Sequence, residues 1–187
     1  EGSRRRSSLE TLESLSALVT VQTRRMKQSL DFETLVATRR SIRGYRPDPI
    51  PQHLMAEIIE IAKRAPSSMN TQPWNFHAIT GAPLELIREG NTERMMAGAA
   101  VDREIKTADH GYQGVHRDRQ VEIAIQLFEA MGIERDDKVR RQDWVMRGFR
   151  QFDAPVSVVV TIDGELAGDT VAHFDCGAAS YGLVLAA

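Results

Sequence analysis

The run Val156–Ile162 consists almost entirely of β-branched residues. Such residues fit the pleated, packed surface of a sheet, so the run predicts a central buried strand. A second strand is predicted at Trp74–Thr80, where Trp74, Phe76 and Ala78 alternate with the residues between them. Helical segments outnumber these strands and lie between them in the chain. We therefore expect an α+β layered domain.

Helical periodicity and capping residues predict the remaining elements. Asp31 is a candidate N-cap for a helix that ends near Thr38. The proline-rich stretch 45–51 cannot continue a helix, because proline lacks an amide donor. Further helices are predicted at residues 52–64, 119–131, 136–150 and 169–187, and another is expected to begin at 84–89 after a turn at 81–83. Small residues in 177–182 are expected to allow close packing of another helix.

Residues 90–120 have poor periodicity and are interrupted by glycines. They predict a loose connector, which is either a lid or substrate wall beside a pocket or a solvent-exposed insertion. Its candidate functional residues are Tyr112, His116, Arg117 and Arg119, and we take Tyr112 and Arg119 as candidate substrate contacts. The histidines are not spaced like metal ligands, so no metal site is expected.

The whole chain has 187 residues and a net charge of −2. This charge gives no general reason to expect nucleic acid or an anionic membrane as a partner. No apolar run is long enough to span a bilayer, and no secretory signal opens the chain. Cys176 is the single cysteine, which is compatible with a reducing cytoplasm. Residues 1–30 are expected to form an extension that is either helical, through leucines at helical spacing, or mobile.

Two polar stretches indicate the chemistry. Residues 39–45, Arg-Arg-Ser-Ile-Arg-Gly-Tyr, hold three guanidiniums and a hydroxyl, which suit phosphate geometry. Residues 66–74, Pro-Ser-Ser-Met-Asn-Thr-Gln-Pro-Trp, offer hydroxyls and carboxamides, which suit the edge of a polar ring. Taken alone, the arginines are better explained as a solvated helix end, because basic runs are common and unspecific.

Together, the two stretches resemble the FMN-dependent nitroreductase family, and in particular its nitrobenzoate- and nitroaromatic-reducing subgroup. The family motifs have the forms R-R-S-x-R-x-[FY] and P-S-S-x-N-x-Q-P-W, and both occur here in the family order. The resemblance extends to Phe152–Pro155 before the valine-rich strand and to Asp175–Ala179 in the last helix. It implies a mixed or antiparallel central sheet flanked by helices, in an intertwined homodimer with FMN at the interface.

Carried over by position, the resemblance assigns two sets of FMN-binding residues. The phosphate and ribityl chain would be held by Arg39, Arg40, Ser41 and Arg43. The ribityl chain and ring would be met by Pro66, Ser67, Ser68, Asn70 and Gln72. The flavin-binding domain would cover residues 31–187.

The implied activity is an NAD(P)H-dependent oxidoreductase that reduces nitroaromatic or quinone-like compounds. Flavin N5 would carry the hydride, so no catalytic protein residue is expected; the co-substrate is NADPH or NADH. The alternatives are another FMN reaction, such as reductive dehalogenation, flavin breakdown or heterocycle oxidation, and a flavin-binding sensor without turnover. A nucleic-acid binder with a basic arm has little support.

Two departures from the family pattern stand out. The family continues beyond the last apolar helix with a glycine-rich loop and a basic residue, whereas this sequence stops at Ala187. We therefore expect a C-terminal segment to be missing. Gly148 stands where the subgroup often has asparagine.

Overall fold

The computed structural model describes residues 31–100 and 111–187. The chain divides into two compact units, Glu1–Ser41 and Ile42–Ala187. The helix expected within residues 1–30 lies outside the described residues, as do residues 101–110 of the expected connector.

The first unit contains helix α2 (Phe32–Thr38), which begins where its N-cap predicts. The Asp31 carboxylate accepts hydrogen bonds from the Thr34 hydroxyl at 2.6 Å and the Thr34 amide at 2.9 Å. These bonds hold the pKa of Asp31 below its usual range, because they stabilise the charged form. The helix ends before Arg39, whose amide still donates to the Leu35 carbonyl at 3.2 Å. The arginine stretch therefore begins at the helix end, as predicted.

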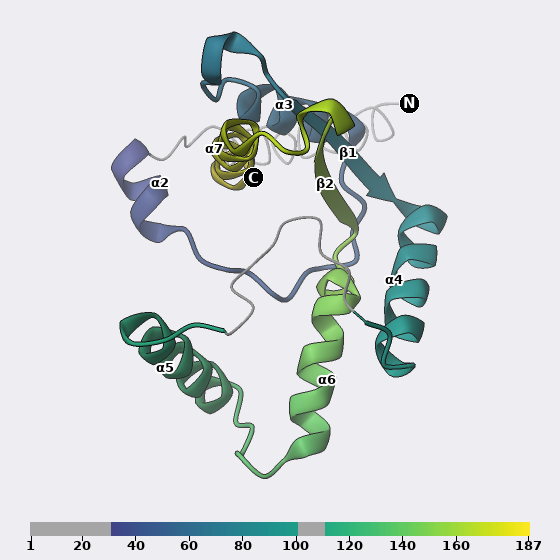
Figure 1. Ribbon diagram of the computed structural model, residues 1–187. Coiled ribbons are helices and arrows are strands. Elements are labelled where there is room, and N and C mark those ends of the chain that lie inside the picture. Colours follow the sequence, from purple (N-terminus) through teal and green to yellow (C-terminus); the bar gives the residue numbers. More distant parts are fainter. Residues whose placement is uncertain (1–30, 101–110) are drawn as a thin grey trace, which may run out of the picture. The chain divides into compact units, whose positions relative to one another are not determined.

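The second unit is built on two antiparallel strands, β1 (Trp74–Thr80) and β2 (Val156–Ile162). Trp74 lies opposite Ile162 and Thr80 opposite Val156. Figure 1 shows the two strands next to each other. Both strands occur at the predicted residues. Trp74 is buried, as expected for a residue on the inward-facing side of the alternating pattern.

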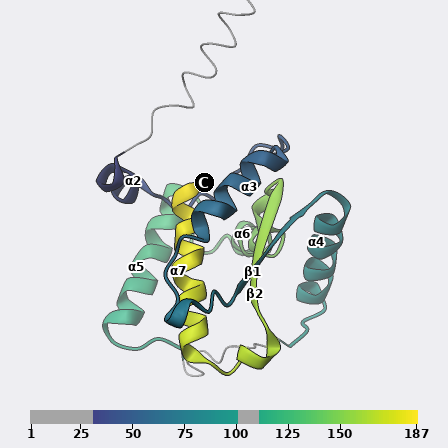
Figure 2. The ribbon, with the colours of Figure 1, turned by 90° about the horizontal axis from the view of Figure 1, so that it is seen from above.

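Helices make up most of the rest of this unit. They are α3 (Gln52–Ala62), α4 (Gly81–Met96), α5 (Val115–Ala130), α6 (Lys138–Phe149) and α7 (Thr170–Ala186), with short 3-10 turns η1 (Ser68–Asn70), η2 (Gln151–Asp153) and η3 (Gly164–Leu166). Both α7 and α4 contact the two strands, α3 packs against α7, and α6 packs against α4. Figure 2 shows α3 and α7 on one side of the strands and α4 on the other. The expected α+β fold, an antiparallel sheet flanked by helices, is confirmed.

Small residues bring α7 and α3 into close contact. A Cβ atom added at Gly182 would lie only 3.3 Å from the Cα atom of Ala62. Ala62 and Ala179 are both fully buried. The prediction that small residues in the last helix permit close helix packing is confirmed.

The prediction for the segment after β1 is wrong in two places. The turn expected at residues 81–83 is the first turn of α4, where Pro83 is tolerated because its missing amide donor has no helical partner there. Gly90 does not end that helix, which continues to Met96. Contacts with α6 explain this: Asn91 Nδ2 donates to the Phe149 carbonyl at 3.2 Å. The connector predicted for residues 90–120 is also shorter at its C-terminal end, because α5 begins at Val115.

The residues of β2 and α7 are less buried than the sequence predicts. The β2 residues are half-buried or exposed, because within the described chain only β1 pairs with this strand. Helix α7 buries Ala172, Asp175 and Ala179 but exposes Phe174. The central strand is therefore less buried in this single chain than its β-branched sequence predicts. The same holds for the last helix, whose composition, rich in Gly, Ala, Leu and Val, predicts a buried helix.

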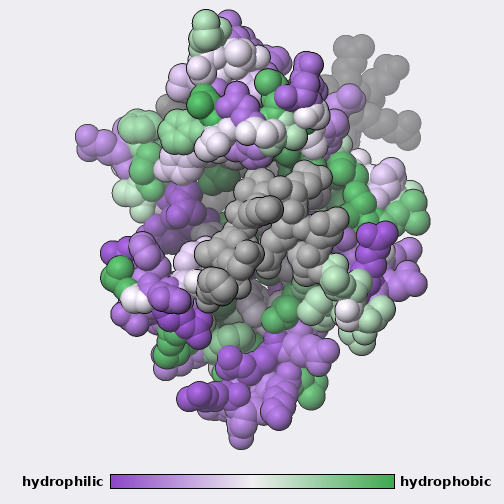
Figure 3. All heavy atoms as spheres, viewed as in Figure 1, coloured by the Kyte–Doolittle hydropathy of each residue, from purple (hydrophilic) through white to green (hydrophobic). Residues whose placement is uncertain are grey.

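Hydrophilic residues gather at the lower end of the face in Figure 3, where Figure 1 draws the connection from α5 to α6. Among the helices described, none combines the length and the apolar character that a membrane span requires.

Candidate functional site

The loop between α3 and β1 presents the second polar stretch. Inside it, the Asn70 amide donates to the Ser67 carbonyl at 3.1 Å, and the Thr71 amide donates to the Ser68 carbonyl at 3.0 Å. The Ser67 hydroxyl accepts from the Gln72 amide at 3.0 Å. The Gln72 side chain donates to Asn70 Oδ1, also at 3.0 Å. The loop is therefore an ordered turn in which the two carboxamides lie side by side.

Three residues of this loop have a left-handed backbone. Met69, Asn70 and Gln72 have φ angles of 50°, 59° and 46°. Such conformations cost about 1 kcal/mol or more per residue and persist only where surrounding contacts enforce them. Strain of this kind is concentrated at ligand-binding positions in proteins, so the loop is a good candidate for one.

A cavity of about 570 Å³ opens beside the loop. Its lining residues are Glu60, Lys63, Arg64, Ala65, Pro66, Asn70 and Gln72. Lys63 Nζ lies 2.7 Å from a Glu60 carboxylate oxygen. The structure thus brings three of the expected flavin-contacting residues, Pro66, Asn70 and Gln72, to one cavity whose wall also holds cationic groups.

One residue that the sequence analysis did not single out anchors the loop. Asp175 Oδ2, on α7, accepts a hydrogen bond of 2.9 Å from the Ser68 amide. Asp175 is only 6% exposed. The sequence does carry a signal for it, because Asp175 is the one charged residue in 170–187. Burial, and then the neighbouring Asp175 carboxylate, raise the pKa of the Cys176 thiol, which disfavours a reactive thiolate.

The first polar stretch is divided between the two units. Arg39, Arg40 and Ser41 belong to the first, where Arg40 Nη1 donates to the carbonyls of Ala37 at 2.9 Å and Arg39 at 2.8 Å. Arg43 belongs to the second. Convergence of this stretch with the loop at 66–72 remains a prediction.

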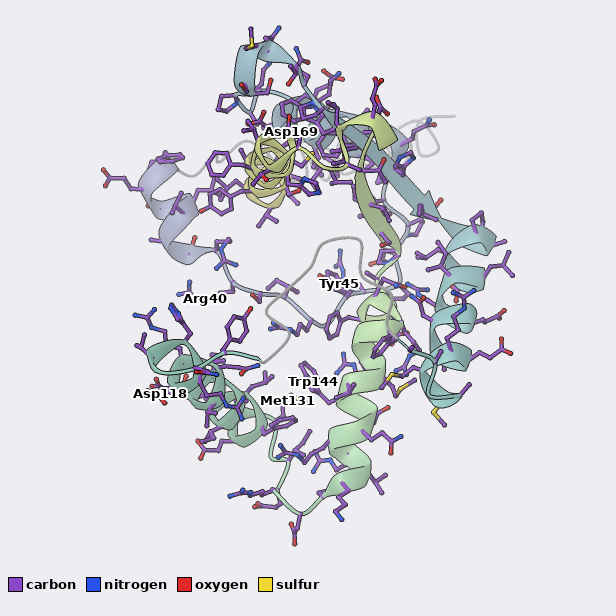
Figure 4. The ribbon with its side chains drawn as sticks, in the orientation of Figure 1. Arg40, Tyr45, Asp118, Met131, Trp144 and Asp169 are labelled. Atoms are coloured by element: carbon purple, nitrogen blue, oxygen red, sulfur yellow. The ribbon has the colours of Figure 1, made fainter. Side chains whose placement is uncertain are left out.

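Within the second unit, Arg43 joins an aromatic cluster. Its guanidinium carbon lies 6.0 Å from the centre of the Phe152 ring, and its carbonyl accepts from Arg147 Nη2 at 2.8 Å. The Phe152 and Trp144 rings are 5.7 Å apart between centres. In Figure 4, Trp144 projects from α6 on the side where α5 lies. The cluster fixes the chain at Arg43 against α6 and η2.

The turn that carries Phe152 is also strained. Gln151, Phe152 and Asp153 have φ angles of 50°, 53° and 55°. Arg88 of α4 supports it from both ends, donating to the Arg150 carbonyl at 3.0 Å and to the Ala154 carbonyl. This explains why the Phe152–Pro155 stretch keeps its shape directly before β2. Nothing in the sequence around Arg88 or Arg147 predicts these contacts.

The candidate substrate residues are exposed. Tyr112 is 60% exposed and precedes α5, and Arg119 is exposed on α5. Arg117 instead lines a cavity of about 630 Å³ along α5, together with residues including Phe128, Ile133 and Arg141. No group of three or more potential metal ligands occurs among residues 31–100 and 111–187.

Comparison with known proteins identifies the family. The nitroreductase family model matches residues 36–187. The chain belongs to the nitroreductase family.

Curated relatives agree with this assignment. The chain is 33% identical to the 4-nitrobenzoate reductase of Pseudomonas putida over 139 residues, which are 73% of this chain and 59% of that protein. It is also 33% identical to the nitrobenzene nitroreductase of Ectopseudomonas oleovorans over 152 residues, 81% of this chain and 67% of that protein. The chain therefore spans well under the full length of the relatives it matches.

Solved structures show the same fold. The chain matches the FMN-dependent nitroreductase NfnB from Mycobacterium smegmatis, solved in complex with NADPH, with a TM-score of 0.75 and 28% identity, covering 82% of this chain and 68% of that one. It matches the FMN- and NADPH-dependent nitroreductase NfnB from sphigopyxis sp. strain HMH with a TM-score of 0.77 and 28% identity, covering 84% of this chain and 70% of that one. The nitroreductase-like layered fold expected from the two polar stretches is confirmed.

Proposed function

We propose that the chain is the flavin-binding part of an NAD(P)H-dependent FMN oxidoreductase that reduces nitroaromatic or quinone-like compounds. The observation that carries the proposal is the strained loop at 66–72, which presents Asn70 and Gln72 to a cavity of about 570 Å³. Family membership, and relatives and solved structures named as nitroreductases, support it.

The donor set fits FMN. A flavin needs cations for its phosphate, hydroxyl partners for its ribityl chain, and paired donors and acceptors for its ring. Arg39, Arg40, Ser41 and Arg43 would hold the phosphate and ribityl chain. Pro66, Ser67, Ser68, Asn70 and Gln72 would meet the ribityl chain and ring. When bound, FMN would supply hydride transfer from a nicotinamide to the acceptor through N5.

The protein's own part in this chemistry is positioning. Carboxamides held by a fixed loop orient a ring without moving protons, which suits a site with no proteinaceous nucleophile. Tyr112 and Arg119 are the residues that we assign to the second substrate, because both are exposed near the start of α5. The domain would extend over 31–187 and act in the cytoplasm.

The visible absorption spectrum tests the proposal. Purified full-length protein is expected to carry or take up FMN, and anaerobic NADH or NADPH is expected to bleach the flavin bands rapidly. Protein that neither carries nor takes up flavin would contradict the proposal. Bound flavin that neither nucleotide reduces would favour the alternative of a sensor without turnover. Turnover of halogenated aromatics in place of nitro compounds would favour reductive dehalogenation.

We further propose that two copies of the chain form a homodimer through α7, with FMN at the interface. The exposed positions Val171, Phe174, Tyr181 and Val184 recur on one face of the helix, and Phe174 is 78% exposed. Large apolar side chains gathered on one helix face are typical of a protein–protein contact.

Phe174→Glu is expected to shift the protein from dimer to monomer, because a charge would have to be buried in an apolar contact. Molar mass from light scattering during size-exclusion chromatography measures this. Ile123→Glu is the matched control, since Ile123 is 62% exposed on α5. Identical masses for the wild type and both variants would refute the α7 interface.

A further inference from the structure

Asp175 is an unusual member of the core. Among the residues that the structure describes, it is the one polar or charged residue in the buried class. A buried carboxylate is costly unless hydrogen bonds compensate for the lost water. Its Oδ2 atom accepts a hydrogen bond of 2.9 Å from the Ser68 amide, 107 positions away in sequence. The contact joins the last helix to the loop that presents Asn70 and Gln72.

The loop needs such an anchor. The hydrogen bonds inside it link residues at most five positions apart, such as the Gln72 amide with the Ser67 hydroxyl. Local bonds alone seldom hold several left-handed residues in place. The bond to Asp175 ties this strained segment to a distant element of the fold.

Helix α7 is a well-packed element and therefore a suitable anchor for the loop. It contacts α3 and both strands. The buried alanines Ala172 and Ala179 lie three positions before and four positions after Asp175, on either side of it along the helix. A polar group fixed on a well-packed element positions a site more accurately than one on a loop.

We propose that Asp175 is a positioning residue for flavin binding: its carboxylate fixes the main chain at Ser68 and thereby sets the geometry of Ser67, Asn70 and Gln72. This inference rests on the proposed function for its ligand. The anchoring of the loop itself does not require flavin and is measurable without it.

The test compares Asp175→Asn, which keeps an acceptor oxygen, with Asp175→Leu, which removes it. Amide hydrogen exchange of the peptide covering residues 66–74 in flavin-free protein is expected to accelerate about tenfold or more in the leucine variant and to stay near wild type in the asparagine variant. The dissociation constant for FMN is expected to rise in the leucine variant and to stay near the wild-type value in the asparagine variant. Asp143→Leu, at an exposed position on α6, is the control.

A second pair of variants approaches the same bond from the loop. Ser68→Pro deletes the donating amide, whereas Ser68→Ala keeps it. Ser67 has φ −139° and ψ 153°, an extended conformation that a following proline accepts. The proline variant is expected to show fast exchange of residues 66–74, whereas the alanine variant is expected to exchange like the wild type. This comparison remains informative even if Asp175→Leu fails to fold.

The outcomes separate the two proposals. Unchanged exchange of 66–74 in folded Asp175→Leu and in Ser68→Pro would overturn the positioning role. Equal acceleration in α3, α4 and α6 would also overturn it, by showing a general packing role. If wild-type protein binds no FMN but the exchange pattern follows the expectation, the proposed function fails while the anchoring of the loop by Asp175 stands.

Discussion

Truncating Leu84 to alanine is expected to lower the free energy of unfolding by about 3 kcal/mol. Leu84 is only 1% exposed and lies in the first turns of α4, which pack on the strand pair. Its loss removes buried apolar surface and leaves a cavity that the surrounding structure fills only in part. Urea unfolding followed by far-UV circular dichroism measures the change.

Leu86→Ala is the matched control on the same helix. Leu86 is 68% exposed, so its truncation is expected to change the stability by less than about 0.5 kcal/mol. Equal losses in the two variants would mean that α4 is not packed as described. The comparison also tests whether residues 81–86 form the start of a helix rather than the turn that their glycine and proline suggest.

The double substitution Arg39→Gln and Arg43→Gln is expected to weaken FMN binding about a hundredfold or more. Each charge-assisted hydrogen bond to a phosphate contributes about 1.5–3 kcal/mol, and glutamine removes the charge while keeping a polar side chain. Quenching of FMN fluorescence during titration measures the affinity. The dependence of that affinity on salt is expected to decrease as well, because fewer charged contacts remain to be screened.

Two comparisons make this result specific. Arg94→Gln with Arg135→Gln removes the same charge from exposed positions elsewhere and is expected to change the affinity little. Riboflavin lacks the phosphate, so its affinity is expected to be nearly the same in the wild type and in the Arg39 and Arg43 variant. A parallel loss for riboflavin and FMN would show that these arginines act on the fold or on the ring and not on the phosphate.

Local signals predicted the elements that depend on neighbouring residues. The strands β1 and β2 were found at the predicted residues, because alternation and β-branching act within a few positions. Helix α2 begins where its N-cap indicates, because the bond from the Thr34 amide to Asp31 closes within one turn. The full length of α4 does not follow from local signals, because contacts with other elements stabilise its second half. One of these contacts is the hydrogen bond from Asn91 to the Phe149 carbonyl.

By itself, the sequence determined the strands, most of the helices, the two polar stretches and, through them, the family of this protein. Only the tertiary structure decided which face of α7 is covered, how closely Gly182 approaches Ala62, and that Asp175 holds the amide of Ser68. The reason is the range of the forces involved. Propensity, capping and periodicity act over a few residues, whereas burial and the pairing of a buried charge join groups that are far apart in the chain and meet only after folding.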